Sequence, residues 1–286
     1  MFKEIAIDPD AASASFKDFN YIIEMFGISE GRLIAAFPSK WKRLVYQSAE
    51  RKLKGTLDLT KIQLRLSKLS DPSFVRKNRP GNGCDENWLQ AALKEHERLP
   101  FDGIISTQNI IQPPVAAAED LYGEHPLRAP NRQWHVLRRA KNMGECCAPV
   151  LRGSKHIKLI DPHFDAGAPR FLNPFVEFMK YLNPGATVDI FRGDVKVNAV
   201  TAVSRLNNAL KGIKPIGVKV RLFLFDEASM HNRFVISEIG GLGFHTGLDE
   251  DWTTDLPEDL VHVLQEDIRI REWSKYKSDG PIGVWD

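Results

Sequence analysis

Cysteine is scarce in this sequence, which contains three cysteines, Cys84, Cys146 and Cys147, and no C-x-x-C spacing. Neither a disulfide framework nor a zinc knuckle is therefore expected. The adjacent pair Cys146 and Cys147 is interpreted as two small buried apolar residues rather than as a redox pair. Because such a sequence fits a reducing compartment, we expect a cytoplasmic protein.

Long apolar runs are also missing. No segment approaches eighteen consecutive apolar residues, so no transmembrane helix is expected. The first ten residues, MFKEIAIDPD, lack the basic, apolar and small-residue sections of a secretory signal. The sequence has no glycine-rich phosphate loop, no G-x-S-x-G and no H-E-x-x-H. No metal and no cofactor are expected. The length of 286 residues and the apolar content of 43% are typical of one large globular domain or two smaller ones.

Charge is unevenly distributed along the chain, although the net charge is only +2. Residues 38–80 hold twelve Lys or Arg against three Asp or Glu, whereas residues 226–286 hold five against fourteen. A basic region can attract phosphate backbones, and on this ground Lys40, Lys42 and Arg43 are candidate substrate-binding residues. The alternative is an ordinary solvated helical face. Nucleic acid is therefore an expected partner.

Helical periodicity dominates the first part of the chain. Apolar residues recur at helical spacing between residues 12 and 70, and a connector rich in Pro, Gly and Asn follows. We therefore predict a mainly helical, basic N-terminal region over residues 1–80 and a second domain over residues 81–286.

The pattern then changes to alternating helices and strands. A helix that begins near Trp88 leads to a strand near residue 104, and after a loop-rich stretch a helical run is expected up to Met143. Further strands are expected in HIKLID, TVDIF, VKVRLFLF, NRFVIS and LGFHTG, and further helices in NPFVEFMKYLN, with Asn173 as its N-cap, and in VNAVTAVSRLNNALKG. This order predicts an α/β fold, with a mainly parallel sheet sandwiched by helices and antiparallel strands added at its end.

One predicted hairpin concentrates titratable side chains between strand-like runs. His231 and Arg233 are two residues apart, so on a strand their side chains lie on the same face. Glu238 follows at the seventh position after His231. A glycine pair then allows a tight turn, and the returning strand brings His245 and Thr246 alongside.

The spacing of a histidine and a cation is not specific by itself. His96 and His156 are also followed, two residues later, by Arg98 and Lys158. Only after His231 does a carboxylate stand at the seventh position. The context therefore separates this hairpin from the other two occurrences.

The hairpin and the elements before it resemble the phospholipase D superfamily. The signature of that family runs H-x-K, four residues, D, six residues, then G-S-x-N. His231, Arg233 and Glu238 stand at its first three fixed positions, and the HTGL of residues 245–248 stands at the last. The resemblance covers roughly residues 145–250 and implies one half of the phospholipase D fold.

The resemblance implies a metal-independent phosphodiesterase, in which one histidine attacks phosphorus and another protonates the leaving oxygen. His231 would be the nucleophile, Arg233 the cation that holds the phosphate, and Glu238 the group that orients an imidazole. Thr246 stands where the family has serine. Because the chain carries one copy of the motif, the second histidine would come from the partner in a homodimer or from His245.

Three departures from the signature bear on the function. Arg replaces Lys, Glu replaces Asp, and the glycine and asparagine of G-S-x-N are absent. Arginine keeps the charge but changes the geometry, so phosphate binding is expected to survive more surely than turnover. Besides a nuclease, two alternatives therefore stay open. One is an inactive module that binds nucleic-acid phosphates or a phospholipid headgroup, and the other is a subunit of a bacterial defence assembly.

Asp161 and His163 stand at the carboxyl end of an expected strand, where α/β proteins gather ligands, and both are candidate substrate-binding residues. Asp161 could instead cap the turn that follows. His231 could equally be a hydrogen-bonded residue at the edge of a strand. Arg233 and Glu238 could form a plain surface ion pair.

Overall fold

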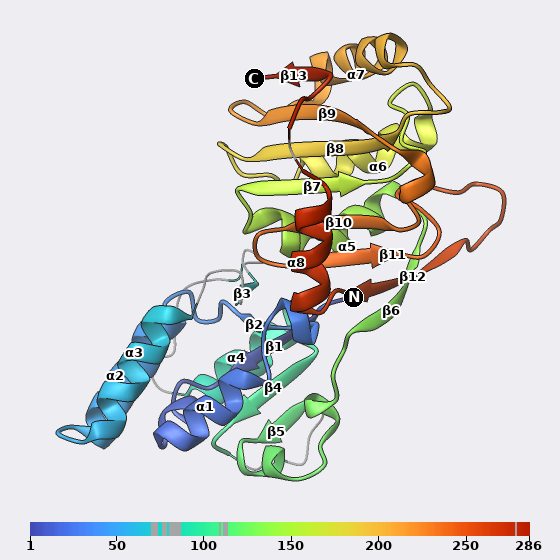
Figure 1. Cartoon of the computed structure of the whole chain (residues 1–286). Coiled ribbons are helices and arrows are strands. Elements are labelled where there is room, and N and C mark those ends of the chain that lie inside the picture. The colour runs from blue at the N-terminus through green and yellow to red at the C-terminus, as the bar shows by residue number, and fades with distance from the viewer. Residues whose placement is uncertain (70–73, 76–78, 80–86, 109, 111–113, 278) are drawn as a thin grey trace. The chain divides into compact units, whose positions relative to one another are not determined.

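The chain folds around two separate β-sheets, one in each of two units (Figure 1). The computed structural model describes residues 1–69, 74–75, 79, 87–108, 110, 114–277 and 279–286. Phe2–Asn131 form the N-terminal unit, and Arg132–Asp286 together with Met1 form the C-terminal unit. The boundary predicted between residues 80 and 81 lies outside the described residues, and the chain divides after Asn131 instead.

The sheet of the N-terminal unit has five parallel strands in the order β3-β2-β1-β4-β5. They are β1 (Lys3–Ile7), β2 (Arg32–Ala35), β3 (Phe74–Val75), β4 (Gly103–Ser106) and β5 (Val115–Ala117). The helices of this unit are α1 (Phe16–Glu24), α2 (Trp41–Leu53), α3 (Leu57–Lys68) and α4 (Trp88–Arg98), with 3₁₀ turns η1 (Ala11–Ser13), η2 (Ile28–Glu30), η4 (Glu119–Tyr122) and η5 (Pro126–Arg128).

Helices cover both faces of this sheet. Ile5 and Ile7 of β1 belong to an apolar cluster with residues of α1, α2 and α3, including Phe19. Ala6 points to the opposite face, where it belongs to a second cluster with Leu89 and other residues of α4. Because side chains alternate along β1, Ile5 and Ile7 pack in the core on one face of the sheet and Ala6 packs in the core on the other face.

The prediction of a mainly helical region over residues 1–80 is wrong in one respect. It predicted the helices α1 to α3 but not the strands β1 and β2. All four residues of β2 are buried, as are all residues of β1 after Lys3. A strand covered on both faces shows no alternation of polar and apolar residues, so its sequence lacks the pattern that identifies a half-buried strand.

The sheet of the C-terminal unit has eight strands in the order β13-β9-β8-β7-β10-β11-β12-β6. They are β6 (Gln133–Leu137), β7 (His156–Ile160), β8 (Thr187–Gly193), β9 (Lys219–Phe225), β10 (Arg233–Ser237), β11 (Gly241–Phe244), β12 (Glu258–Val263) and β13 (Gly283–Trp285). Only β7, β8 and β9 are mutually parallel, and the other neighbouring pairs of described strands are antiparallel. The α/β class is as predicted, but the sheet of this unit is mixed rather than mainly parallel.

The helices of this unit are α5 (Ala140–Arg152), α6 (Pro169–Met179), α7 (Ala199–Ile213) and α8 (Glu266–Lys275), with the 3₁₀ turn η6 (Glu227–Ser229). Figure 1 shows α8 in front of the sheet, with α5 and α6 behind it. The helical run expected up to Met143 is wrong in its first part, because β6 occupies that segment and α5 begins only at Ala140. The N-cap of α6 is Ala168 rather than Asn173, which lies inside the helix.

Two buried basic side chains hold α8 against the sheet. Lys158 of β7 is 4% exposed, and its Nζ donates to the carbonyl oxygens of Trp273 at 2.9 Å and Tyr276 at 2.5 Å. Arg269 of α8 donates to the carbonyl of Ser237 at the end of β10, at 2.8 Å. A cation at the C-terminus of a helix satisfies carbonyl groups that have no partner within the helix. The helix is therefore fixed over β10, the strand that begins at Arg233.

The interpretation of the cysteine pair as buried apolar residues is confirmed. Cys146 and Cys147 are both buried in α5. Burial raises the pKa of Cys146 to about 11 and that of Cys147 well above its usual value, so neither thiol is reactive at neutral pH. Cys84 lies outside the described residues. Among the residues that are described, no helix is long and apolar enough to cross a membrane.

Candidate functional site

Strand β10 places the predicted motif where the strands of the C-terminal sheet end. It lies between β7 and β11 and runs antiparallel to both. Phe234 is opposite Ile160 of β7, and Arg233 is opposite Phe244 of β11. The beginning of β10 therefore lies beside the carboxyl ends of its two neighbours. The residue after Phe244 is His245, so the antiparallel register brings it close to Arg233.

A hollow of about 410 Å³ opens beside the beginning of β10 and the end of β11. Its polar lining includes three imidazoles, two guanidinium groups and one carboxylate, those of His231, His245, His262, Arg233, Arg271 and Glu272. We call it the histidine hollow. The structure thus brings together three of the predicted site residues, His231, Arg233 and His245. It adds three residues that the sequence did not single out, from β12 and α8.

His262 is the most informative of the residues that were not predicted. It lies on β12 opposite Gly243 of β11, and its ring occupies the space over that glycine. Burial lowers its pKa, and the neighbouring His245 lowers it further. Its imidazole is therefore neutral at physiological pH. The one signal in the sequence was a histidine between two valines in a strand-like run, which by itself is weak.

Arg233 occupies an unusual position between the hollow and the interior. One of its terminal nitrogens donates to the carbonyl of His231 at 3.2 Å. Its Nε is buried and has no hydrogen-bond partner among the described residues. Burial raises the pKa of Asp161, and the nearby guanidinium of Arg233 opposes that rise. A buried N–H without an acceptor is costly.

His231 and His245 are both exposed side chains in the hollow. Within the described part of the chain, no hydrogen bond fixes either imidazole. Arg271 of α8 is largely exposed and forms an ion pair of 3.1 Å with the buried Glu272. The hollow therefore combines two exposed imidazoles with cations on two of its sides.

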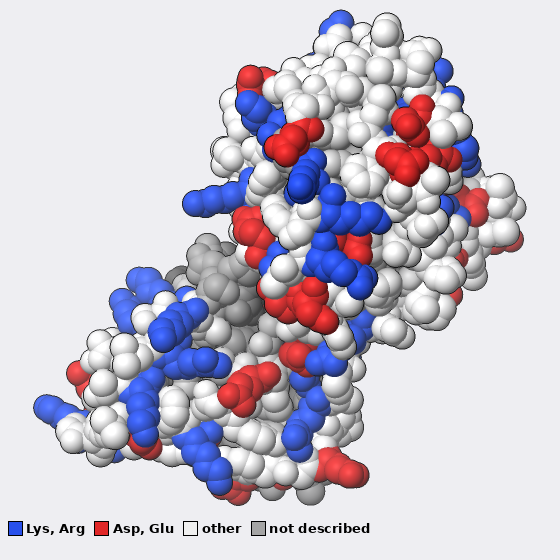
Figure 2. Space-filling view, in the orientation of Figure 1, with Lys and Arg blue, Asp and Glu red and all other residues white. Residues whose placement is uncertain are grey.

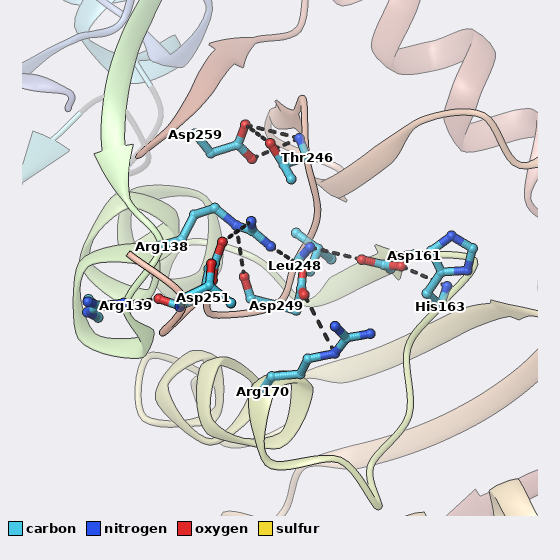
Figure 3. A network of polar contacts seen from close by, with 11 residues as sticks. Arg138, Arg139, Asp161, His163, Arg170, Thr246, Leu248, Asp249, Asp251 and Asp259 are labelled. Carbon is cyan, nitrogen blue, oxygen red and sulfur yellow. Dashed lines mark hydrogen bonds and ion pairs between the residues drawn. The ribbon is translucent and has the colours of Figure 1, made fainter. Parts of the chain in front are cut away.

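Asp161, directly after β7, is buried and holds two neighbouring loop segments through its carboxylate. It is 2% exposed, and its two carboxylate oxygens accept the N–H groups of His163 at 2.8 Å and Leu248 at 2.9 Å (Figure 3). Burial raises its pKa, and the two backbone donors oppose that rise. The contacts are those of a capping residue, which was the alternative reading, and they leave no free face for a substrate. By holding Leu248, Asp161 fixes the loop that follows His245.

Thr246 has a similar supporting role. Its N–H and its hydroxyl both donate to the buried carboxylate of Asp259 on β12, at 3.0 Å (Figure 3). Further along the loop, Arg138 forms ion pairs with Asp249 at 2.7 Å and Asp251 at 3.2 Å. These contacts hold the loop that joins β11 to β12, so the chain directly after His245 is anchored at several points.

Two predicted residues lie away from the hollow. Glu238 follows the far end of β10, where its carboxylate accepts the N–H groups of Lys155 and His156, the latter at 3.1 Å. Glu238 stands seven positions after His231, a span of about 20 Å along extended chain. Its carboxylate binds backbone N–H groups there, so the expectation that it orients an imidazole of the hollow is wrong. His163 is also not among the lining residues, and its Nδ1 lies 3.2 Å from the ammonium of Lys196.

The three predicted basic residues lie in the N-terminal unit, at the start of α2. Lys40, Lys42 and Arg43 line a pocket of about 250 Å³ together with the partly buried ring of Phe74. Trp41, between them, is a core residue whose indole N–H donates to the carbonyl of Ile7 at 2.6 Å. Figure 2 shows Lys and Arg side chains gathered over α2 and α3.

The start of α2 lacks the features that usually stabilise a helix N-terminus. Lys40 is its N-cap residue and makes no capping hydrogen bond, and its first turn contains no acidic residue. Cations at this position oppose the helix dipole, whereas anions are favoured there. The local electrostatics therefore suit a negatively charged partner.

Comparisons with known proteins add little to this geometry. No family model matches the chain, and no curated protein matches it. Among solved structures, one similar chain is TrmBL2, an archaeal chromatin protein whose structure is described as showing a novel mode of DNA binding. The match covers 51% of each chain, at 16% identity and a TM-score of 0.29. A likeness this weak carries no argument about fold or function.

Proposed function

We propose that the protein is a metal-independent phosphodiesterase, a nuclease that cleaves nucleic-acid phosphodiesters through a histidine nucleophile. The observation that carries the proposal is the convergence of three imidazoles and two guanidinium groups on one hollow of about 410 Å³. An imidazole can attack phosphorus or transfer a proton near neutral pH, and a guanidinium binds two phosphate oxygens at once. These are the groups that such a reaction requires.

The proposed reaction has two steps. His231 attacks phosphorus, the bond to the leaving oxygen breaks, and protonated His245 gives its proton to that oxygen. Water then attacks the phosphohistidine, a neutral imidazole accepts a proton from the water, and His231 is released. Arg233 and Arg271 hold the non-bridging oxygens and stabilise the charge that develops on them. His262, with its lowered pKa, suits the role of proton acceptor in the second step.

The order of elements from β7 to β11 supports the resemblance to half of a phospholipase D fold. In that family two motifs supply the two histidines, which for a single-motif chain points to a homodimer. Here His245 and His262 line the same hollow as His231, so one chain already holds several imidazoles. We keep the cytoplasmic homodimer as part of the proposal, and the mass of the particle in solution tests it.

In this proposal both units bind nucleic acid: the histidine hollow of the C-terminal unit binds the phosphate that is cleaved, and the basic residues at the start of α2 bind the phosphate backbone. The exposed Lys40 and Arg43 and the half-buried Lys42, whose ammonium also donates to the carbonyl of Leu69, suit a phosphate backbone. Replacing the three together by Gln should weaken binding. Because each phosphate contact releases about one counterion, the slope of log affinity against log salt should fall by up to about 3. Replacing the exposed Lys94, Lys141 and Lys211 in the same way provides the matched control.

The decisive experiment measures cleavage in EDTA of internally labelled single- and double-stranded DNA and RNA. We expect cleavage by the intact protein, none by His231→Ala, and an alkali-stable, labelled phosphohistidine on the protein. His135→Ala, which removes an exposed histidine of β6, should cleave normally. Cleavage that persists unchanged in His231→Ala, or that stops on chelation, would contradict the proposal.

A second candidate is a binding module that holds a phosphate without turnover. The observation in its favour is that Glu238 and Thr246, two positions of the signature, bond to the backbone and to Asp259 rather than to an imidazole. In this case nucleic acid or a phospholipid headgroup should bind without a covalent intermediate, and Arg233→Ala should abolish that binding. Such a module could serve as a subunit of a bacterial defence assembly, which co-purification of partner proteins would test.

A further inference from the structure

A second candidate site lies in the N-terminal unit, at the place where its strand order reverses. The chain runs from β1 outward to β2 and β3, and then crosses back to β4 and β5 on the other side of β1. The flanking helices α1 and α4 cover opposite faces of the sheet. In open parallel sheets, ligands bind outside the carboxyl ends of the strands at such a reversal.

A pocket of about 250 Å³ is found at this position, and we call it the switch-point pocket. Its wall includes Ala11 and Ala14, which follow β1, Thr107, which follows β4, and Ala118, which follows β5. Three neighbouring parallel strands therefore end on one cavity. Three of these four residues are alanines, whose short side chains leave the space open.

The remaining lining residues give the pocket an acidic and aromatic character. Asp18 and Tyr21 come from α1, and Glu119 and Tyr122 come from η4. No Lys, Arg or His is among the described lining residues. The two tyrosine rings stack on each other at 4.7 Å, and the hydroxyl of Tyr122 donates to Asp18. An anionic ligand such as a nucleotide phosphate is therefore disfavoured.

The tyrosine rings already attract cations from the surrounding chain. The ammonium of Lys17 lies 5.7 Å from the centre of the Tyr122 ring, and the guanidinium of Arg128 lies 5.3 Å from that of Tyr21. Such contacts are favourable because the face of an aromatic ring carries negative charge. The carboxylate of Glu119 is exposed at the pocket and has no partner among the described residues. It is free to bind a positive charge.

A further carboxylate lies behind the wall. Asp8, directly after β1, is 7% exposed and accepts a hydrogen bond from the hydroxyl of Thr107 at 3.3 Å. Its pKa is raised by burial. When it is ionised, this carboxylate adds negative potential behind the pocket, which favours a cation over an anion.

We propose that the switch-point pocket binds a small organic cation, an aliphatic diamine or triamine. Its ammonium groups would contact Glu119 and Asp18, while its methylene groups would pack on the alanines and on Ile22. A molecule with charges separated by methylenes matches a lining in which carboxylates and aromatic faces alternate with small apolar side chains. The proposal is independent of the chemistry assigned to the histidine hollow.

The test is a calorimetric titration of the full chain with spermidine and putrescine at low and moderate salt. Ala14 is exposed at the pocket, so Ala14→Trp should fill its mouth without disturbing the fold and should remove binding. Glu119→Gln should weaken spermidine by about twofold to fivefold, the scale of one exposed charge contact. Glu124→Gln, an exposed residue nearby that does not line the pocket, should change the affinity by less than about twofold.

Two results would overturn the proposal. One is equal weakening by Glu119→Gln and Glu124→Gln with no effect of Ala14→Trp, which would mean that amines bind to acidic surface in general. The other is the absence of amine binding. If adenosine then bound and Ala14→Trp removed that binding, the pocket would be assigned to an uncharged nucleoside. Circular dichroism of each variant confirms that the chain is folded.

Discussion

The imidazole of His262 lies over Gly243, the residue opposite it on the neighbouring strand, so closely that a Cβ on the glycine would come within 2.3 Å of the ring. The glycine is therefore what allows the ring to occupy this position in the lining of the histidine hollow. The relationship joins two residues nineteen positions apart in the sequence, and it bears directly on the behaviour of the hollow.

Replacing Gly243 by Ala should displace this imidazole. The new methyl group would overlap the ring, so we expect a loss of about 1–3 kcal/mol in the free energy of unfolding and a shift of the pKa of His262 back towards its ordinary value as the ring becomes exposed. Proton NMR of the histidine ring signals against pH measures the shift. Gly212→Ala in α7, where nothing lies within 4 Å, is the control and should be neutral or slightly stabilising. An unchanged His262 signal in Gly243→Ala would contradict the geometry.

The lowered pKa of His262 should make the protein less stable in mild acid. The folded state binds this proton only at a lower pH than the unfolded state, for which the pKa is about 6.5. As the pH falls below 7, the unfolded state therefore holds more protons, and the free energy of unfolding decreases. His262→Gln should flatten this dependence between pH 7.5 and 5.5, as measured by urea titration. Parallel curves for the two proteins would show that His262 is not the group responsible.

Asp161→Asn should loosen the loop that carries His245. An amide has one acceptor oxygen, whereas the carboxylate receives N–H groups from both His163 and Leu248. One backbone N–H would lose its acceptor, at a cost of about 1–3 kcal/mol. Hydrogen exchange at the amide of either His163 or Leu248 should accelerate, while exchange in α7 should not change. Unchanged protection of both amides would count against this role.

Arg79 should be one of the most sensitive positions of the N-terminal unit. Its guanidinium is 1% exposed and forms ion pairs of 2.9 Å with Glu4 and Glu95, both also buried. Arg79→Met would leave these carboxylates buried without that partner, a change that costs about 3–5 kcal/mol.

The matched control for Arg79 is Arg98→Met. Arg98 binds the same Glu95, but its side chain is 52% exposed, so its loss should cost less than about 1 kcal/mol. Denaturant titrations of the two variants measure the difference. Similar losses for both would mean that burial does not govern the strength of these pairs.

The sequence predicted the regular part of the C-terminal unit because its elements follow simple patterns. The strands β7 to β11 and helix α7 lie where apolar runs and the glycine and asparagine signals placed them. The strand β6 was missed although Trp134 and Val136 alternate with exposed residues, because the short run was read as part of a helix. The strands β1 and β2 could not be identified by alternation, since both of their faces are covered.

The candidate site was only partly predictable for a different reason. His231, Arg233 and His245 belong to one hairpin, whose geometry follows from local strand periodicity and a turn. His262 and Arg271 reach the hollow through the pairing of β12 and the docking of α8. Those contacts depend on which strand lies beside which, and no spacing in a single sequence specifies that.

The strand order of the C-terminal unit has a consequence for handling the protein. The first strand of the unit, β6, and the last, β13, form its two outer borders, where they pair with β12 and β9. Removing β6 would expose unpaired backbone N–H and C=O groups of β12, and removing β13 would expose those of β9. Exposed strand edges of this kind promote aggregation. A shortened form of this unit should therefore keep residues 133–137 and 283–285 to stay dispersed in solution.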